Sequence, residues 1–257
     1  MSPSAPERVQ ATAGGRGGRR RVVPEGLAII VTIDGPAGTG KSTVARLLAR
    51  RLGLDFLDTG AMYRAAAAIV IDRGVAPEDT ETIVRVVTEA DLHFDWTADP
   101  PAILDAGRPM GERIREADVT AIVSRIAAIP ELRRGMVRKQ RLIGAQHPRL
   151  VTEGRDQGSV VFPDALCKFY LDADARVRAH RRAEQLRQGG REVDELALLE
   201  QIRERDRLDT SRQEGPLTCP PDAELVDTTS LTVEEVIDRL AASVMRVVQQ
   251  THKDVED

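Results

Sequence analysis

Eight consecutive residues have the types and spacing of a loop that binds nucleotide phosphates. The segment Gly35-Pro36-Ala37-Gly38-Thr39-Gly40-Lys41-Ser42 fits the pattern G-x-x-x-x-G-K-[ST]. Glycines let the backbone N–H groups of such a loop point at phosphate oxygens, and the N-terminus of the following helix adds partial positive charge. We expect Lys41 to reach the β- and γ-phosphates of ATP and Ser42 to bind the accompanying Mg²⁺. With Thr43, these residues form the predicted ATP-binding set.

Arginines in predicted loops and turns supply further cations. Phosphoryl transfer gathers many negative oxygens, so catalysis depends on fixed positive charges from several directions. Arginine suits this task because its planar guanidinium grips phosphate through two hydrogen bonds and stays charged. Arg155 lies between two glycines just after a predicted strand, where ligands bind in parallel sheets. A surface ion pair is the alternative for any one of these arginines alone, although the setting of Arg155 favours a functional role. The candidates are Arg64, Arg155, Arg205 and Arg212.

The elements around these residues alternate between short apolar runs and helical patterns. A β-branched run at 27–34 precedes the phosphate loop, and a helix that Gly53 closes follows it. This strand–loop–helix order predicts a parallel sheet with helices on both faces. Further strands are expected at 54–57, 149–153, 168–171 and 225–226.

Two regions depart from this alternation. Alternating residues at 92–96 and a partner run at 102–104 predict a small antiparallel element, followed by helices from 118 to 146 with a break at Pro130. Charged helices are expected at 174–188 and 193–208. Gly189-Gly190 between them is either a hinge or an ordinary helix stop, and the sequence does not choose. Thr232 to Glu235 is a capping box that starts a terminal helix.

Composition narrows the class of protein. The 257 residues are 41% hydrophobic but only 3% aromatic, so the core must be mainly Ala, Val, Leu and Ile. A net charge of −4 argues against nucleic acid as the general partner. Two cysteines suit a reducing compartment, and we expect a cytoplasmic monomer. No stretch is long and apolar enough to cross a membrane, and the four histidines lack metal-ligand spacing.

Residues 1–26 form a glycine- and arginine-rich arm without an apolar period. We interpret it as a disordered basic tail. A tether for RNA or an acidic partner and a transit peptide are the alternatives. A chain that begins at Ala28 is therefore expected to keep its activity.

Five motifs follow one another along the chain: Ile33 to Arg64, Glu153-Gly154-Arg155-Asp156-x-Gly158-x-Val160-Val161-Phe162-Pro163-Asp164-Ala165, Arg178-Ala179-His180-Arg181-Arg182, Glu204-Arg205-Asp206-Arg207-Leu208-Asp209 and Asp227-Thr228-Thr229. In this order they resemble the motifs of bacterial cytidylate kinases, and the resemblance covers about residues 28–245. The resemblance implies a P-loop nucleoside monophosphate kinase fold: α/β, with a five-stranded parallel sheet, an acceptor-binding insert near 90–145 and a mobile lid near 188–221, all within a domain at 27–250. It implies transfer of the γ-phosphoryl group of ATP to CMP or dCMP with Mg²⁺.

The resemblance also assigns roles. Cytosine would be held by Ser124, Arg133 and Asp156, and a carboxylate is a suitable acceptor for the cytosine amino group. Asp209 would bind the ribose hydroxyls, and Glu153 would be an outer partner of Mg²⁺ or simply an exposed strand end. The remaining acceptor-binding residues implied are Thr59, Tyr63, Arg64, Arg155, Arg205 and Arg212, of which Tyr63 also fits one face of a buried helix.

Departures from the family pattern and rival functions remain. Gln157 stands where an apolar residue is usual, and Arg108-Pro109-Met110-Gly111 replaces a more acidic stretch. A kinase of the same fold acting on another nucleotide or on shikimate is one alternative. A GTPase reading guanine through Asn-Lys-x-Asp is disfavoured, because the chain contains no asparagine. An RNA-binding regulator that uses the arginine arm is another alternative.

Overall fold

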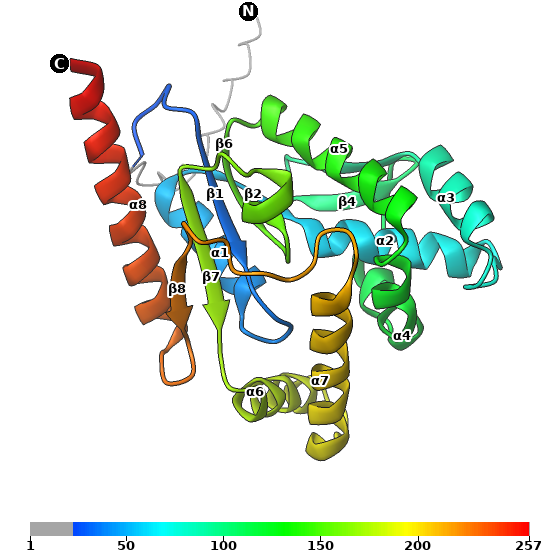
Figure 1. Ribbon diagram of the computed structural model, residues 1–257. Coiled ribbons are helices and arrows are strands. Elements are labelled where there is room, and N and C mark those ends of the chain that lie inside the picture. Colours follow the sequence, from blue (N-terminus) through cyan, green and yellow to red (C-terminus); the bar gives the residue numbers. More distant parts are fainter. Residues whose placement is uncertain (1–22, 257) are drawn as a thin grey trace, which may run out of the picture.

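A five-stranded, all-parallel sheet forms the centre of the computed structural model, which describes residues 23–256 and side chains as far as residue 251 (Figure 1). Its strand order is β2-β6-β1-β7-β8. This architecture confirms the α/β class expected from the sequence. The strands are β1 Ile29–Asp34, β2 Asp55–Asp58, β6 Arg149–Glu153, β7 Cys167–Asp172 and β8 Glu224–Asp227.

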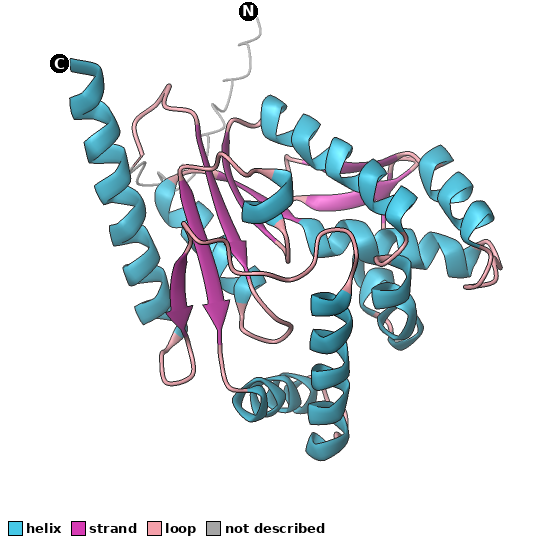
Figure 2. Ribbon diagram, viewed as in Figure 1, coloured by secondary structure: helices cyan, strands magenta, loops and turns pink. Residues whose placement is uncertain are grey.

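Helices cover both faces of this sheet (Figure 2). Helix α1 (Lys41–Leu52) and helix α8 (Val233–Glu256) share one face with the apolar side chains of β1, among them Val31 and Ile33. Helix α5 (Pro130–Gln146) and a π-helical turn, η2 (Gln157–Val161), lie over the other face, where a Cβ at Gly144 would meet both Phe162 and Ile30. Because both faces are buried, the strands need continuous apolar runs, which is the pattern that the sequence shows.

Local signals at the helix ends behave as predicted. Gly53 closes α1 in the left-handed conformation, with φ of 70°. At the start of α8, Thr232 N–H donates to Glu235 Oε2 at 2.8 Å, and Glu235 N–H donates to Thr232 Oγ1 at 3.3 Å. The capping box is thus reciprocal.

The region between β2 and β6 forms a body with its own apolar cluster, which includes Ile83, Val119 and Ile126. Helix α2 (Thr59–Asp72) leads into it, and a three-stranded antiparallel sheet stands where the sequence predicted two strands. The third strand has only two residues, too few for an alternating pattern, which explains why it was missed. The other elements are α3 Thr80–Glu89, β3 Leu92–Asp95, β4 Ala102–Asp105, β5 Arg108–Pro109, a 3₁₀ helix η1 Gly111–Arg115, and α4 Ala117–Ile126.

Helices α6 (Ala175–Gln188) and α7 (Glu195–Ser211) pack on each other through a small cluster of Ala179, Leu199 and Ile202. They stand apart from the sheet at the end where β7 stops (Figure 1). Gly189 caps α6, and Gly190 follows with φ of 75°. The assignment of residues 188–221 as a mobile lid stays a prediction.

The packed body begins earlier than the sequence indicated. Val23 is buried, and its N–H donates to the Leu52 carbonyl at 3.5 Å. The Arg149 guanidinium donates to the carbonyls of Val23, Pro24 and Leu27. Residues 23–26, predicted to belong to the arm, are therefore part of the folded unit, while residues 1–22 lie outside the described part of the chain.

These contacts predict different stabilities for two truncations of the N-terminal arm. Removing residues 1–22 is expected to leave turnover within about twofold of the full chain, because it spares every contact described above. Removing residues 1–27 also deletes the buried Val23 side chain, which contributes about 1.5–3 kcal/mol. Melting temperatures of the two truncations measure the difference; equal values would show that residues 23–27 add nothing to stability.

Candidate active site

The predicted phosphate loop lies between the end of β1 and the start of α1, close against β7. Gly35 has φ of 144°, and a Cβ there would clash with the carbonyl oxygen of Leu171. Only glycine fits this approach. Lys41 is buried, and its Nζ donates to the Pro36 carbonyl at 2.6 Å and to Thr39 Oγ1 at 3.3 Å. Burial, with the positive charge of Arg155 next, lowers the pKa of Lys41 to about 7, although the charges of Glu153 and Asp34 oppose this change.

Carboxylates lie beside the loop where the sequence placed the magnesium site. Ser42 Oγ donates to Glu153 Oε1 at 2.7 Å, and Glu153 pairs across the sheet with Asp58. Burial and the charge of Glu153 raise the pKa of Asp58 to about 7. A buried glutamate and a half-buried aspartate next to a serine hydroxyl suit a hard divalent cation, which prefers oxygen ligands. Within residues 23–251 no cluster of side chains could hold a metal alone, so any Mg²⁺ would depend on nucleotide phosphates for its remaining ligands.

Asp34, the last residue of β1, joins the phosphate loop to the loop after β6. Its two carboxylate oxygens accept the N–H groups of Gln157 at 2.9 Å and Gly158 at 2.7 Å. Burial raises the pKa of Asp34 to about 7, and these two hydrogen bonds oppose the rise. The sequence analysis missed this role, although the position at the carboxyl end of a parallel strand is a signal that marks such residues.

The pKa of Asp34 gives a pH-dependent stability. The folded pKa is raised above the unfolded value of about 3.9, so the contribution of Asp34 is fully present at low pH and is lost as pH rises through about 7. Asp34→Asn cannot titrate. The melting temperature of this variant, relative to the unmodified protein, is therefore expected to rise between pH 5 and pH 8.

A matched control is Asp222→Asn. The Lys168 ammonium holds the pKa of the exposed Asp222 below its usual range, so this variant should show a constant difference over the same pH interval. A constant difference for Asp34→Asn as well would contradict the assignment.

Three predicted site residues meet in one ion network. Arg155 Nε donates to Asp209 Oδ2 at 2.7 Å, and Arg212 Nε donates to the Asp209 carbonyl at 3.2 Å. Arg205 is close enough for its charge to lower the pKa of Lys41. Burial and the neighbouring Arg155 lower the pKa of Arg205 itself to about 10, and its Nε is buried without a hydrogen-bond partner among the described residues. Crowded, desolvated cations of this kind favour a bound polyanion.

The residues expected to read the base form a second buried pair. Arg133 and Asp156 hydrogen-bond to each other, and their side chains are only 3% and 5% exposed. The Arg133 guanidinium lies over the ring of Tyr63, 5.4 Å from its centroid. Gly215, with φ of 57°, rests against the pair so closely that a Cβ would clash with both side chains. The third expected residue, Ser124, lies on α4 one turn before Ala127, whose carbonyl accepts from Arg133 at 3.1 Å.

The remaining predicted residues lie at the same end of the sheet. Thr59 Oγ1 donates to the Glu153 carbonyl at 2.7 Å and so ties α2 to β6. Arg64 donates to the Ile114 carbonyl at 3.2 Å and to Thr120 Oγ1 at 2.9 Å. Burial and the charge of Arg182 lower its pKa.

Gln157, the departure from the family pattern, is fully buried and makes its own network. Its Oε1 accepts from Thr152 Oγ1 at 2.9 Å, and its Nε2 donates to Gln140 Oε1 at 3.1 Å. A polar residue is therefore tolerated here because the amide has partners on β6 and α5.

Two further residues attach helices α6 and α7 to the phosphate loop. Asp206 Oδ1 accepts from the Ala37 N–H at 3.3 Å, and its Oδ2 accepts from Arg178 Nη1 at 2.6 Å. Arg178 also donates to the Ala37 carbonyl at 2.9 Å. Both stand in motifs that carry the family resemblance, but sequence reasoning did not assign them a role.

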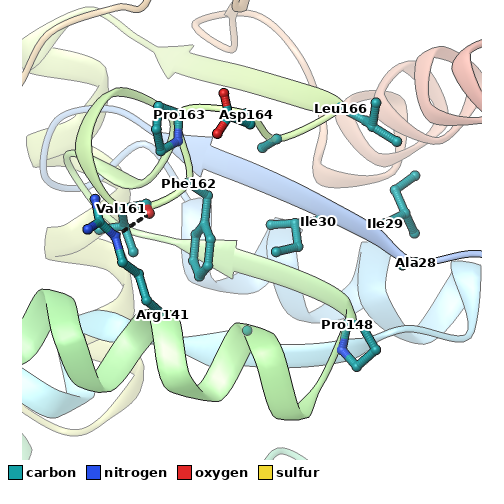
Figure 3. A pocket seen from close by; sticks show the side chains of 12 residues that line it. Ala28, Ile29, Ile30, Arg141, Pro148, Val161, Phe162, Pro163, Asp164 and Leu166 are labelled. Atoms are coloured by element: carbon teal, nitrogen blue, oxygen red, sulfur yellow. Dashed lines mark hydrogen bonds between the residues drawn. The ribbon is translucent and has the colours of Figure 1, made fainter.

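A separate hollow of about 570 Å³ lies at the opposite end of the strands (Figure 3). Ala28 and Ile29 line it at the start of β1, and Arg141 borders it while donating to the carbonyls of Val160 and Val161. Phosphate-binding groups lie at the other ends of these strands, so this hollow is distinct from the candidate site. No helix within the described residues meets the length and hydropathy needed to cross a membrane.

A phosphate loop after β1, arginines converging on it from several elements, and an inserted body beside it define a P-loop kinase of the nucleoside monophosphate kinase type. A family model described as cytidylate kinase matches residues 31–246. The chain belongs to the cytidylate kinase family.

Curated relatives agree with this assignment. The cytidylate kinase of Caldanaerobacter subterraneus subsp. tengcongensis is 44% identical over 220 residues, covering 86% of this chain and 96% of its own. That of Nocardia farcinica is 45% identical, covering 88% of this chain and 96% of its own. The crystal structure of TT1252 from Thermus thermophilus is 22% identical, covers 85% of this chain and 96% of its own, and has a TM-score of 0.42; the assignment does not rest on it.

Proposed function

We propose that this protein transfers the γ-phosphoryl group of ATP to CMP or dCMP, giving ADP and CDP or dCDP. Family membership supports the reaction, and the observation that carries it is the set of buried cations beside the phosphate loop, with Lys41 and Arg205 both depressed in pKa. Like charges are gathered there at a free-energy cost, and a bound polyanion would offset that cost.

The transfer is a direct, in-line displacement. An oxygen of the acceptor phosphate attacks the γ-phosphorus of ATP, the new O–P bond forms, and the bond to the β-phosphate oxygen breaks with ADP as leaving group. Lys41 would leave the Pro36 carbonyl to bind the transferring phosphoryl group. Arg155, Arg205 and Arg212 would neutralise charge that develops in the transition state. Arg64 and Tyr63 would orient the acceptor nucleotide.

The residues also suit Mg²⁺ bound with ATP. Ser42 would be a ligand, and Glu153 would hold the serine hydroxyl and act from outside the coordination sphere. When bound, Mg²⁺ would supply positive charge that stabilises the negative phosphate oxygens.

Recognition of cytosine would fall to Asp156, Arg133 and Ser124, with Asp209 on the ribose. The enzyme would act as a monomer. The two free cysteines, Cys167 and Cys219, support a cytoplasmic location. Nucleic acid is not proposed as a partner, and the arm at residues 1–22 stays outside the described part.

A coupled assay of ADP release tests the proposal. Each nucleoside monophosphate, with shikimate as a further acceptor, is supplied in turn with ATP and Mg²⁺. CMP and dCMP should give the highest catalytic efficiency. The proposed reaction would be refuted if none of the acceptors raised the rate of ADP release above the rate with ATP alone.

A further inference from the structure

Two arginines in the 3₁₀ helix η1 stand in opposite settings. A 3₁₀ helix has three residues per turn, so side chains two positions apart leave it on different sides. Arg113 donates to Asp72 at 3.0 Å, to Glu116 at 2.8 Å and to Asp118 at 2.9 Å. Its charge is therefore matched by carboxylates, and its role is to hold η1 against α2 and α4.

Arg115 has no such match. Its residue is exposed, and among residues 23–251 its guanidinium makes no ion pair and no hydrogen bond. The charge of Arg115 interacts with Asp58, whose pKa it lowers against the larger effects of burial and Glu153. With no hydrogen bond among the described residues to break, the Arg115 guanidinium is available to a ligand at the edge of the proposed phosphate site.

The backbone next to Arg115 lies on the acceptor side of the proposed site. The residue before it, Ile114, is buried, and its carbonyl accepts from Arg64 Nη1 at 3.2 Å. The backbone that carries Arg115 therefore lies directly against the guanidinium of Arg64, the residue proposed to orient the acceptor nucleotide. Asp72, the partner of Arg113, is eight residues further along α2, about 12 Å away along the helix axis.

Electrostatics agrees with this geometry. Burial and the charge of Arg182 lower the pKa of Arg64, the charge of Asp58 opposes them, and the charge of Arg115 lowers the pKa further. Burial, Arg191 and Arg115 likewise lower the pKa of Arg182, which lies on α6. Cations from α2, η1 and α6 thus repel one another across a common space. An anion placed among them would turn this repulsion into attraction.

We propose that Arg115 binds the phosphate group of the acceptor nucleotide alongside Arg64. This inference rests on the proposed function and adds a binding residue supplied by the inserted body. A dianionic monophosphate offers enough oxygens for two guanidinium groups. Arg182 on α6 would add a third positive charge near this phosphate, since its charge and that of Arg115 interact.

The test separates the phosphate from the rest of the nucleotide. Dissociation constants for CMP and for cytidine, which lacks the phosphate, are measured with Arg115→Ala, Arg115→Lys and the control Arg113→Ala, together with KM for CMP and ATP. Arg115→Ala should weaken CMP binding by about 10- to 100-fold and leave cytidine and the KM for ATP within about threefold. Arg115→Lys should recover part of the lost CMP affinity, because lysine restores the positive charge but not the paired hydrogen-bond donors of the guanidinium group.

The control Arg113→Ala shows the effect of losing a structural arginine in the same 3₁₀ helix. Arg113→Ala breaks three ion pairs and should lower the melting temperature while leaving the ratio of CMP to cytidine affinity unchanged. Equal weakening of CMP and cytidine by Arg115→Ala would overturn the inference, and so would unchanged CMP binding. A loss confined to ATP would overturn the assignment to the acceptor phosphate.

Failure of the proposed function is distinguishable from failure of the inference. If the unmodified protein shows no CMP-dependent release of ADP, the proposed function and the inference both fail. If it is active and Arg115→Ala matches it in CMP affinity, only the inference fails.

Discussion

Lys41→Ala is expected to lower kcat by several orders of magnitude while the protein stays folded. A preorganised donor at a transferring phosphoryl group typically contributes about 3–4 kcal/mol, or at least about 10²–10³-fold in rate. The lost interaction forms with phosphate and not within the free protein, where Lys41 bonds only to its own loop. Burial depresses the pKa of Lys41, so removal of its charge should not destabilise the fold. Kinetics and thermal melting of the same preparation test both parts.

Lys168→Ala is a matched control, because Lys168 is also a buried lysine. It donates to the Pro163 carbonyl at 2.5 Å and to Asp222 at 2.6 Å, away from the phosphate loop. This variant should lose stability and keep kcat. Lys41→Met preserves the aliphatic packing and covers the case in which alanine disturbs the loop. A folded Lys41 variant with near-normal turnover would remove this residue from the mechanism.

Asp156→Asn is expected to narrow the preference for CMP over UMP. The carboxylate can accept from the cytosine amino group, but it would face the O4 acceptor of uracil with no hydrogen between them. Leaving two buried acceptors opposed costs about 1–3 kcal/mol, so the unmodified enzyme should prefer CMP by at least about tenfold. Asparagine offers uracil a donor and still accepts from cytosine through its carbonyl. Catalytic efficiency should therefore fall more for CMP than for UMP.

The structure also shows how Asp156 could have a purely structural role. Asp156 is the buried partner of Arg133, so the substitution also weakens an ion pair. If that were its only effect, catalytic efficiency would fall by the same factor for CMP and for UMP. Asp209→Asn is the matched control: it is another buried aspartate paired with an arginine, but it is proposed to bind the ribose common to both nucleotides. Its CMP to UMP ratio should stay at the unmodified value. The same constant ratio in Asp156→Asn would leave Asp156 as scaffolding.

The sequence by itself determined the local features. The glycine and lysine spacing of the phosphate loop, the apolar runs of the strands, the stop at Gly53 and the capping box at Thr232 depend on residues within a few positions of one another. Short-range periodicity and capping chemistry record such features directly. Element boundaries were accordingly close, with errors at the two-residue strand β5 and at the start of the packed body.

The tertiary structure alone decided which charged groups meet. Arg155 and Asp156 are adjacent in sequence, yet Arg155 pairs with Asp209, 54 residues away, and Asp156 pairs with Arg133, 23 residues away. The order of the sheet has the same origin, since β6 pairs with β2 although three strands, four α-helices and one 3₁₀ helix lie between them in the chain. Ion-pair partners depend on the direction that each backbone imposes on its side chains and on which elements pack together. Neither property is encoded in residue spacing, so a sequence rich in arginine and aspartate is compatible with many pairings until the fold selects one.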